Sequence, residues 1–233
     1  MSEGTPKLLL FDIDGTLLAG ATDAHRDALH AALREVHGVE SSGPRPSLSP
    51  AGRTDSEIAR AILLDEGVSA ERIDDRLEDV RDACCRHYAR LCPADLSHTV
   101  LPGVRVLLEE LAARSDVVLS LVTGNYEPVA RLKLGRAGIG RAFAAGQGAF
   151  GSDAEDRAAL PHLARRRAGA DGVPHPRERT IVIGDTPRDI ACARADELRC
   201  IAVASGPFER SALSGADHVV GDASELAGLL RAL

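Results

Sequence analysis

The stretch LLLFDIDGTLL, residues 8–18, places two aspartates two positions apart at the end of an apolar run, and Gly-Thr follows at once. Because aspartate is depleted in strands, the run predicts a buried strand at residues 7–12 that ends where the carboxylates begin. In an open parallel sheet, ligands bind beyond the carboxyl ends of the strands. Asp12 and Asp14 therefore predict a functional site at this edge.

Other short apolar runs also fit buried parallel strands. They cover residues 117–122, 180–185 and 199–203, and residues 143–145 and 217–220 are weaker candidates. Helical stretches separate these runs, which is typical of a doubly wound α/β sheet.

Residues 18–100 contain no convincing strand and predict a helical insertion after the first strand. Ala24, Ala28, Ala32 and Val36 recur at helical spacing, and Gly38 follows as a stop signal. Residues 54–57 match a capping box that opens a second helix ending near residue 67, and residues 73–91 mark one face of a long third helix. We therefore expect a core of residues 1–17 and 101–233 and an inserted helical domain of residues 18–100. Residues 38–53, rich in Ser, Pro and Gly, predict a long irregular loop.

The composition limits the possible partners. A net charge of −7 argues against a broad nucleic-acid or membrane surface, although a local pocket can still hold a small anion. Five cysteines without CxxC spacing favour reduced, buried thiols. The N-terminus resembles no signal peptide, and no apolar run approaches the ~20 residues of a membrane helix. We expect a soluble cytoplasmic protein, and no pattern indicates its oligomeric state.

Polar clusters follow three of the predicted strands. Asp12 and Asp14 follow the first, Thr123, Gly124 and Asn125 the second, and Asp185 and Asp189 the third. Four carboxylates at one edge repel one another unless a cation binds, and Mg²⁺ with a phosphate suits such a site. One aspartate can then act as a nucleophile and a second as a general acid and base.

These clusters resemble the motifs of the haloacid dehalogenase superfamily. DIDGT at residues 12–16 is similar to its first motif, LVTGN at 121–125 to its second, and IGDTPRD at 183–189 to its fourth. GADHVVGDASEL at 215–226 also resembles the end of many members. The resemblance implies a Rossmann-like α/β core whose helical cap lies between the first two motifs.

The resemblance also implies residue roles. Asp12 would be the nucleophile and Asp14 the general acid and base. Mg²⁺ would sit on the Asp12 carboxylate, the Asp14 backbone carbonyl and Asp185, with Asp189 near by or acting through water. Thr123, with Gly124 and Asn125, would bind the phosphoryl group.

The third motif, a basic residue before the fourth, departs from the family pattern. Residues 148–163 contain no Lys, and Arg157 stands in its place. Lys133 is the other candidate, but a helix starting near Tyr126 puts it about 10 Å along from the site, which slightly favours Arg157. Arg53 lies where related caps often touch the leaving group, and a solvated position is an equal alternative.

The sequence thus predicts a Mg²⁺-dependent phosphatase for a small phosphorylated metabolite, similar to the phosphoglycolate phosphatase group, which works through an aspartyl-phosphate. A sugar phosphomutase with the same core motifs is the nearest alternative. Haloacid dehalogenation is disfavoured, because Asp14 and the fourth motif would have no role in it. A non-catalytic binding protein that keeps the fold is a further alternative, supported only by the altered third motif.

Overall fold

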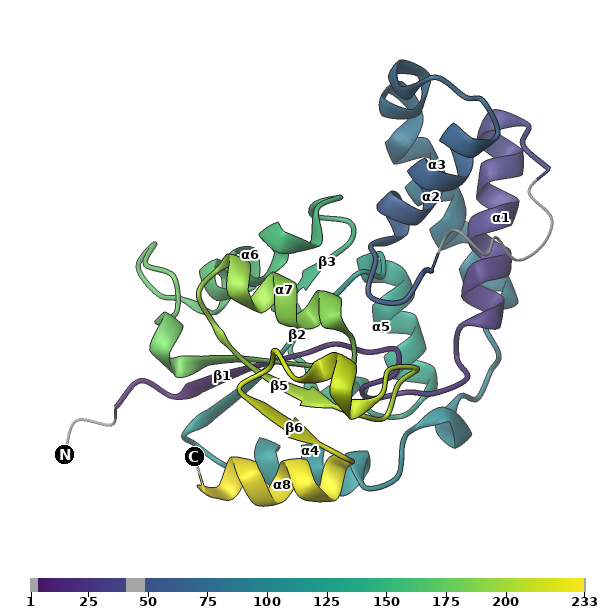
Figure 1. The fold of residues 1–233 in the computed structure, drawn as a ribbon. Coiled ribbons are helices and arrows are strands. Elements are labelled where there is room, and N and C mark those ends of the chain that lie inside the picture. The colour runs from purple at the N-terminus through teal and green to yellow at the C-terminus, as the bar shows by residue number, and fades with distance from the viewer. Residues whose placement is uncertain (1–3, 41–48, 233) are drawn as a thin grey trace.

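Six parallel strands form the framework of the fold in the computed structural model, which describes residues 4–40 and 49–232 (Figure 1). Their order across the sheet is β3-β2-β1-β4-β5-β6. The strands are β1 Lys7–Phe11, β2 Val117–Thr123, β3 Ala149–Phe150, β4 Thr180–Gly184, β5 Arg199–Val203 and β6 His218–Val220. The chain reverses its direction of winding at β1, so the carboxyl ends of β1, β2 and β4 border the crevice where such sheets bind ligands.

The sheet is covered on both faces, which explains the continuous apolar run in β1. Leu9 and Phe11 pack into one core, and Leu8 and Leu10 pack into another. The first core includes residues of α4 Val104–Ala112, α5 Glu127–Arg136 and α8 Ala223–Ala232, and the second includes residues of α6 Leu160–Ala168 and α7 Pro187–Ala195. This confirms the doubly wound α/β class.

Five of the six predicted strand positions are confirmed: residues 199–203 match β5 at both ends, and the other four differ by a residue at one end. Asp12 and Asp185 lie just beyond their strands, whereas Thr123 ends β2. The candidate at residues 143–145 is wrong, because Phe143 follows a short 3₁₀ turn and buries its ring edge-on against Phe11. The third strand in the chain is instead β3, whose two residues pair with the end of β2.

Three helices form the lobe that stands beside the sheet in Figure 1: α1 Asp23–His37, α2 Asp55–Asp65 and α3 Ala70–Leu91. We call them the helical lobe. They share a separate apolar cluster, which also takes in Tyr126 and Val129 at the start of α5. Gly38 ends α1 with a φ of 72°, as its sequence position predicts. Thr54 caps α2 by accepting the N–H of Glu57, but the Glu57 carboxylate pairs with Arg53 rather than completing a capping box.

The two connections to the helical lobe lie side by side. Leu18 forms an antiparallel bridge with Val100, and backbone hydrogen bonds join Ala19 to Thr99 and Leu101 to Leu17. This pairing fits the proposed division into residues 1–17 with 101–233 and residues 18–100, which stays a prediction. Half of the expected irregular loop, residues 41–48, lies outside the described residues.

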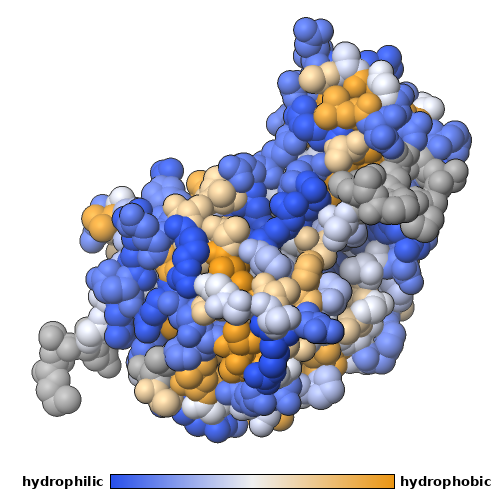
Figure 2. Space-filling model, in the orientation of Figure 1, coloured by the Kyte–Doolittle hydropathy of each residue, from blue (hydrophilic) through white to orange (hydrophobic). Residues whose placement is uncertain are grey.

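The visible face is mostly hydrophilic, and its apolar side chains form separate patches on both lobes (Figure 2). Among the described residues, no helix has the length and apolar character needed to cross a membrane.

Candidate active site

Three of the predicted carboxylates meet at the end of the central strands. Asp12 follows β1, Asp185 follows β4, and Asp189 lies in the first turn of α7. All three are buried, and one oxygen from each lies within 4.8 Å of the others. The backbone N–H of Asp12 donates to the carbonyl of Ile183 in β4, which fixes the first two acids relative to each other.

Asp185 is held tightly and keeps one oxygen unpaired. Its Oδ1 accepts the Thr16 hydroxyl at 2.9 Å, whereas its buried Oδ2 has no hydrogen-bond partner. Gly15 and Gly206 pack directly against this oxygen, so that a Cβ at either position would overlap it. A buried, unpaired carboxylate oxygen among further carboxylates is suited to a cation.

The carboxyl groups of the acidic cluster oppose one another's ionisation. Burial raises the pKa of Asp12 to about 7 and that of Asp185 to about 8, and repulsion from the neighbouring aspartates adds to both shifts. Oxygen ligands alone, closely spaced and partly unpaired, fit a hard divalent ion rather than zinc or copper.

Arg157 lies inside this cluster. Its guanidinium is 3.1 Å from Asp12 Oδ1 and pairs with Asp189, and its buried Nε has no partner. Asp189 is also the partner of Thr186 in a capping box at the start of α7. The structure thus places Arg157 against two of the acids, and its assignment to the third motif stays a prediction.

Lys133 also reaches the site, and the expectation that it lies too far away is wrong. Its Nζ is 2.9 and 2.8 Å from the two carboxylate oxygens of Asp14 and 2.9 Å from Asn125 Oδ1. Side chains on a helix point back toward its N-terminus, so the long lysine chain offsets the rise along α5. Lys133 therefore pairs with Asp14, whereas Arg157 pairs with Asp12 and Asp189.

Asp14 has surroundings unlike those of Asp12. Burial opposes its ionisation, but the charge of Lys133 and hydrogen bonds from Lys133 and Asn125 outweigh it and lower the pKa of Asp14. Asn125 Nδ2 donates to Asp14 at 3.0 Å and to the Thr123 hydroxyl at 3.3 Å. The pKa values of the two aspartates of the first motif are thus shifted in opposite directions because their neighbours differ.

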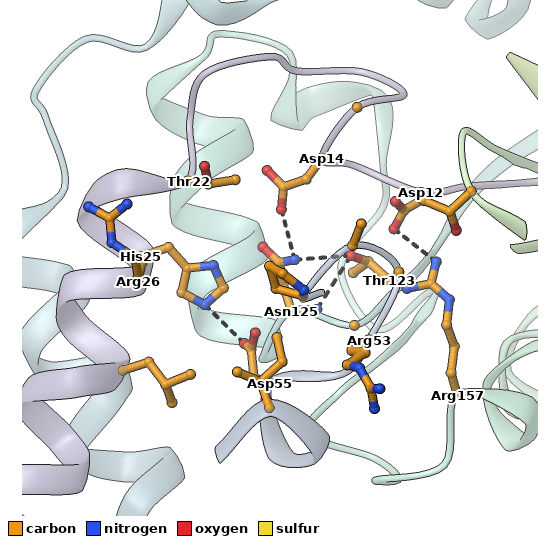
Figure 3. Close-up of a pocket in the computed structure, with 18 of the residues that line it drawn as sticks. Asp12, Asp14, Thr22, His25, Arg26, Arg53, Asp55, Thr123, Asn125 and Arg157 are labelled. Atoms are coloured by element: carbon orange, nitrogen blue, oxygen red, sulfur yellow. Dashed lines mark hydrogen bonds and ion pairs between the residues drawn. The ribbon is translucent and has the colours of Figure 1, made fainter. Parts of the chain in front are cut away.

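The helical lobe contacts the same edge. Gly124 accepts the N–H of Asp55, and the backbone of Arg53 lies so close that a Cβ on Gly124 would overlap it. The Arg53 side chain donates to the Ser49 carbonyl and pairs with Glu57 at the cavity wall, and among the described residues it makes no hydrogen bond with the aspartates of the site. Figure 3 shows Arg53 and Arg157 on the side of the cavity away from Thr22 and Arg26.

A cavity of about 430 Å³ lies between the two lobes. Asp12, Asp14, Asp185, Thr123 and Arg157 line its floor, and α1 and α2 contribute residues to its wall. Two of these, His25 and Asp55, are hydrogen-bonded to each other and were not singled out by sequence reasoning. In the sequence, Asp55 looks like an ordinary acidic residue in the first turn of a helix, and no pattern indicates that it contacts His25.

A doubly wound sheet, buried acids at its switch point and a helical lobe over them define a capped α/β enzyme. The haloacid dehalogenase-like hydrolase family matches residues 9–194 of this chain, and the chain belongs to that family.

Two relatives are phosphoglycolate phosphatases. The one from Rhodospirillum rubrum is 31% identical over 209 residues, covering 86% of this chain and 80% of the relative. The one from Pseudomonas syringae pv. syringae is 28% identical over 207 residues, covering 86% and 70%. The chain is therefore a hydrolase of the phosphatase kind.

The fold itself is shared more widely. A β-phosphoglucomutase structure from Clostridium difficile matches with a TM-score of 0.67 at 19% identity, covering 95% of this chain and 93% of that one. At this identity the match shows the fold alone.

Proposed function

We propose that this chain is a Mg²⁺-dependent phosphatase that hydrolyses a small phosphate monoester through an aspartyl-phosphate on Asp12. The observation that carries the proposal is the contrast between Asp12 and Asp14. Asp12 lies among buried acids beside Arg157, whereas Asp14 is held ionised by Lys133 and Asn125. Two carboxylates with environments that push their pKa values apart suit two different roles.

The residues present fit the metal. Asp12, Asp185 and Asp189 would hold Mg²⁺ with the backbone carbonyl of Asp14, and Asp185 Oδ2 is the unpaired oxygen that such an ion satisfies. When bound, Mg²⁺ neutralises charge on the carboxylates and on the phosphoryl oxygens.

The proposed first step forms a bond between an Asp12 oxygen and phosphorus while the bond to the leaving oxygen breaks. Asp14 gives a proton to that oxygen. The charge of Lys133 outweighs burial and lowers the pKa of Asp14, and the negative charge of an entering phosphoryl group raises it again, so Asp14 takes up this proton from solvent as the substrate enters. Arg157 and Thr123 hold the phosphoryl oxygens, and Lys133 keeps Asp14 oriented.

In the proposed second step, Asp14 takes a proton from water as the water oxygen attacks phosphorus. The bond between Asp12 and phosphorus breaks, and inorganic phosphate leaves. A carboxylate that rests in its ionised form suits this base role.

The test is phosphate release from a panel of small monoesters with and without Mg²⁺. Phosphoglycolate comes first, because it is named in two relatives and fits a cavity of about 430 Å³. Asp12→Asn should abolish turnover. Asp79→Asn, the same change at an exposed position on α3, should leave turnover unchanged.

The products separate this proposal from its rivals. Free phosphate supports hydrolysis, whereas an isomeric sugar phosphate without phosphate release supports a phosphomutase. No turnover across the panel with Mg²⁺ would favour a binding protein that keeps the fold.

A further inference from the structure

Asp55 joins three segments of the chain through one oxygen. It is the first residue of α2 and is buried. Its Oδ2 lies 3.0 Å from His25 Nε2 on α1 and 2.7 Å from the backbone nitrogen of Tyr126, just before α5. The first partner belongs to the helical lobe and the second to the sheet lobe. The carboxylate is therefore a direct link between the wall and the floor of the cavity.

The link to Tyr126 fixes where Asp55 sits. Tyr126 is the N-cap of α5 and has no side-chain cap of its own. A carboxylate there satisfies an orphan N–H and is favoured by the positive end of the helix dipole. Tyr126 follows directly after Thr123, Gly124 and Asn125 in the chain. The contact therefore ties Asp55 to the loop proposed to bind the phosphoryl group.

The link to His25 fixes the orientation of the imidazole. A carboxylate oxygen can only accept a hydrogen bond, so we assign the proton shared with His25 to Nε2. The Tyr88 ring packs edge-on against the imidazole with centroids 5.6 Å apart. Figure 3 shows the second ring nitrogen turned toward the side of the cavity where Asp14 and Asn125 lie. Among the described residues, Nδ1 makes no side-chain hydrogen bond.

We propose that Asp55 is a positioning residue that holds His25 Nδ1 against the leaving group of the substrate, beside Asp14. This rests on the proposed phosphatase function. The arrangement selects monoesters with a hydroxyl or carboxylate next to the ester carbon, because imidazole accepts from the former when neutral and donates to the latter when protonated. This arrangement is complete only while Asp55, at the start of α2, accepts the backbone N–H of Tyr126.

The test is a double-mutant cycle of His25→Ala and Asp55→Ala on two substrates. The first is phosphoglycolate, or the best polar monoester from the phosphate-release panel. The second is p-nitrophenyl phosphate, which has no hydrogen-bonding group near its ester oxygen.

Each single variant should lower kcat/KM for the polar substrate by about 10- to 100-fold, as loss of a charged-group hydrogen bond implies. The double variant should match the larger single loss, and p-nitrophenyl phosphate should change by less than about threefold. Asp79→Asn is the matched control, and thermal unfolding checks that each variant is folded. Losses that multiply, or equal losses on both substrates, would overturn the proposal.

A second measurement does not depend on turnover. The ¹⁵N imidazole spectrum of the intact protein should show His25 protonated on Nε2, and Asp55→Ala should change that signal. An unchanged signal would overturn the proposal even if the chain were shown to release phosphate. Conversely, a changed signal in a protein without phosphatase activity would refute the proposed function and leave the positioning contact standing.

Discussion

Asp12 and Asp14 are separated by one residue, yet their side chains contact different partners. Asp12 faces Arg157 and two buried acids, and Asp14 faces Lys133. Both acids lie just beyond the end of β1, and each basic residue comes from a distant segment of the chain. The opposite pKa shifts of the two acids therefore arise from tertiary contacts.

Lys133→Met is predicted to destabilise the protein. The substitution keeps the buried volume but removes the partner of Asp14, and breaking such a pair costs about 3 kcal/mol at pH 7. The folded-state pKa of Asp14 is lowered, so its stabilisation is present above the unfolded pKa and is lost as pH falls through the folded pKa. The stability gap between wild type and variant should therefore shrink from pH 6 to pH 3.

Urea unfolding at several pH values measures this gap. Lys7→Met is the control, since its ion pair with the half-exposed Asp116 spans 3.9 Å and contributes less than about 1 kcal/mol. A gap that stays constant over this pH range would contradict the assignment of Lys133 to Asp14.

The sequence predicts the acids better than their partners. The spacing of the motifs places Asp12, Asp14 and Asp185 correctly, because strand ends of a parallel sheet share one edge. It misplaces Lys133, since rise along a helix measures backbone positions and not the reach of a side chain. The hydrogen bond between His25 and Asp55 joins residues thirty positions apart, and no local pattern encodes it.

At the scale of elements, the loop after β5 shapes the acidic pocket. Gly206 touches the unpaired oxygen of Asp185, and a side chain there must displace the carboxylate. The sequence gives no sign of this role, because one glycine among many in turns carries no distinct pattern. The short strand β3 is missed for a similar reason: two residues are too few to show a period.

Gly206→Ala is predicted to weaken Mg²⁺ binding and to lower activity by about 10- to 100-fold, since ligand positions must hold within about 0.5 Å. Calorimetric titration with Mg²⁺ and phosphate-release assays provide the two readouts. Gly228→Ala in α8, where an added Cβ meets nothing within 4 Å, should keep both and gain about 0.5–1 kcal/mol of stability. Equal Mg²⁺ affinity in both variants would show that Asp185 is not a ligand.

At the scale of the molecule, the helical lobe is fastened to the sheet lobe at α2. Arg60 forms two hydrogen bonds with Glu155, at 2.5 and 2.9 Å, and Thr54 donates to the Glu155 carbonyl. Glu155 lies two residues before Arg157, so these contacts couple the lobe to a residue of the site. We predict that the lobe opens about its two connections to the sheet, residues 17–21 and 97–102.

Glu155→Gln is predicted to loosen this attachment by about 1 kcal/mol, because the ion pair is partly exposed. Hydrogen exchange in α2 should become faster, whereas exchange in β1 and β4 should not change. Glu178→Gln, at an exposed turn away from the lobe, is the control. If hydrogen exchange in α2 had the same rate in the wild type and in both variants, the contacts of Glu155 would not be what attaches the lobe.

The most direct test of the central claim is mass spectrometry of the enzyme quenched in acid during turnover of its best monoester with Mg²⁺. The account predicts one phosphoryl group on the peptide that contains Asp12, and none in Asp12→Asn, which should also release no phosphate. Phosphate release without a phosphoryl group on that peptide, or wild-type turnover by Asp12→Asn, would contradict it.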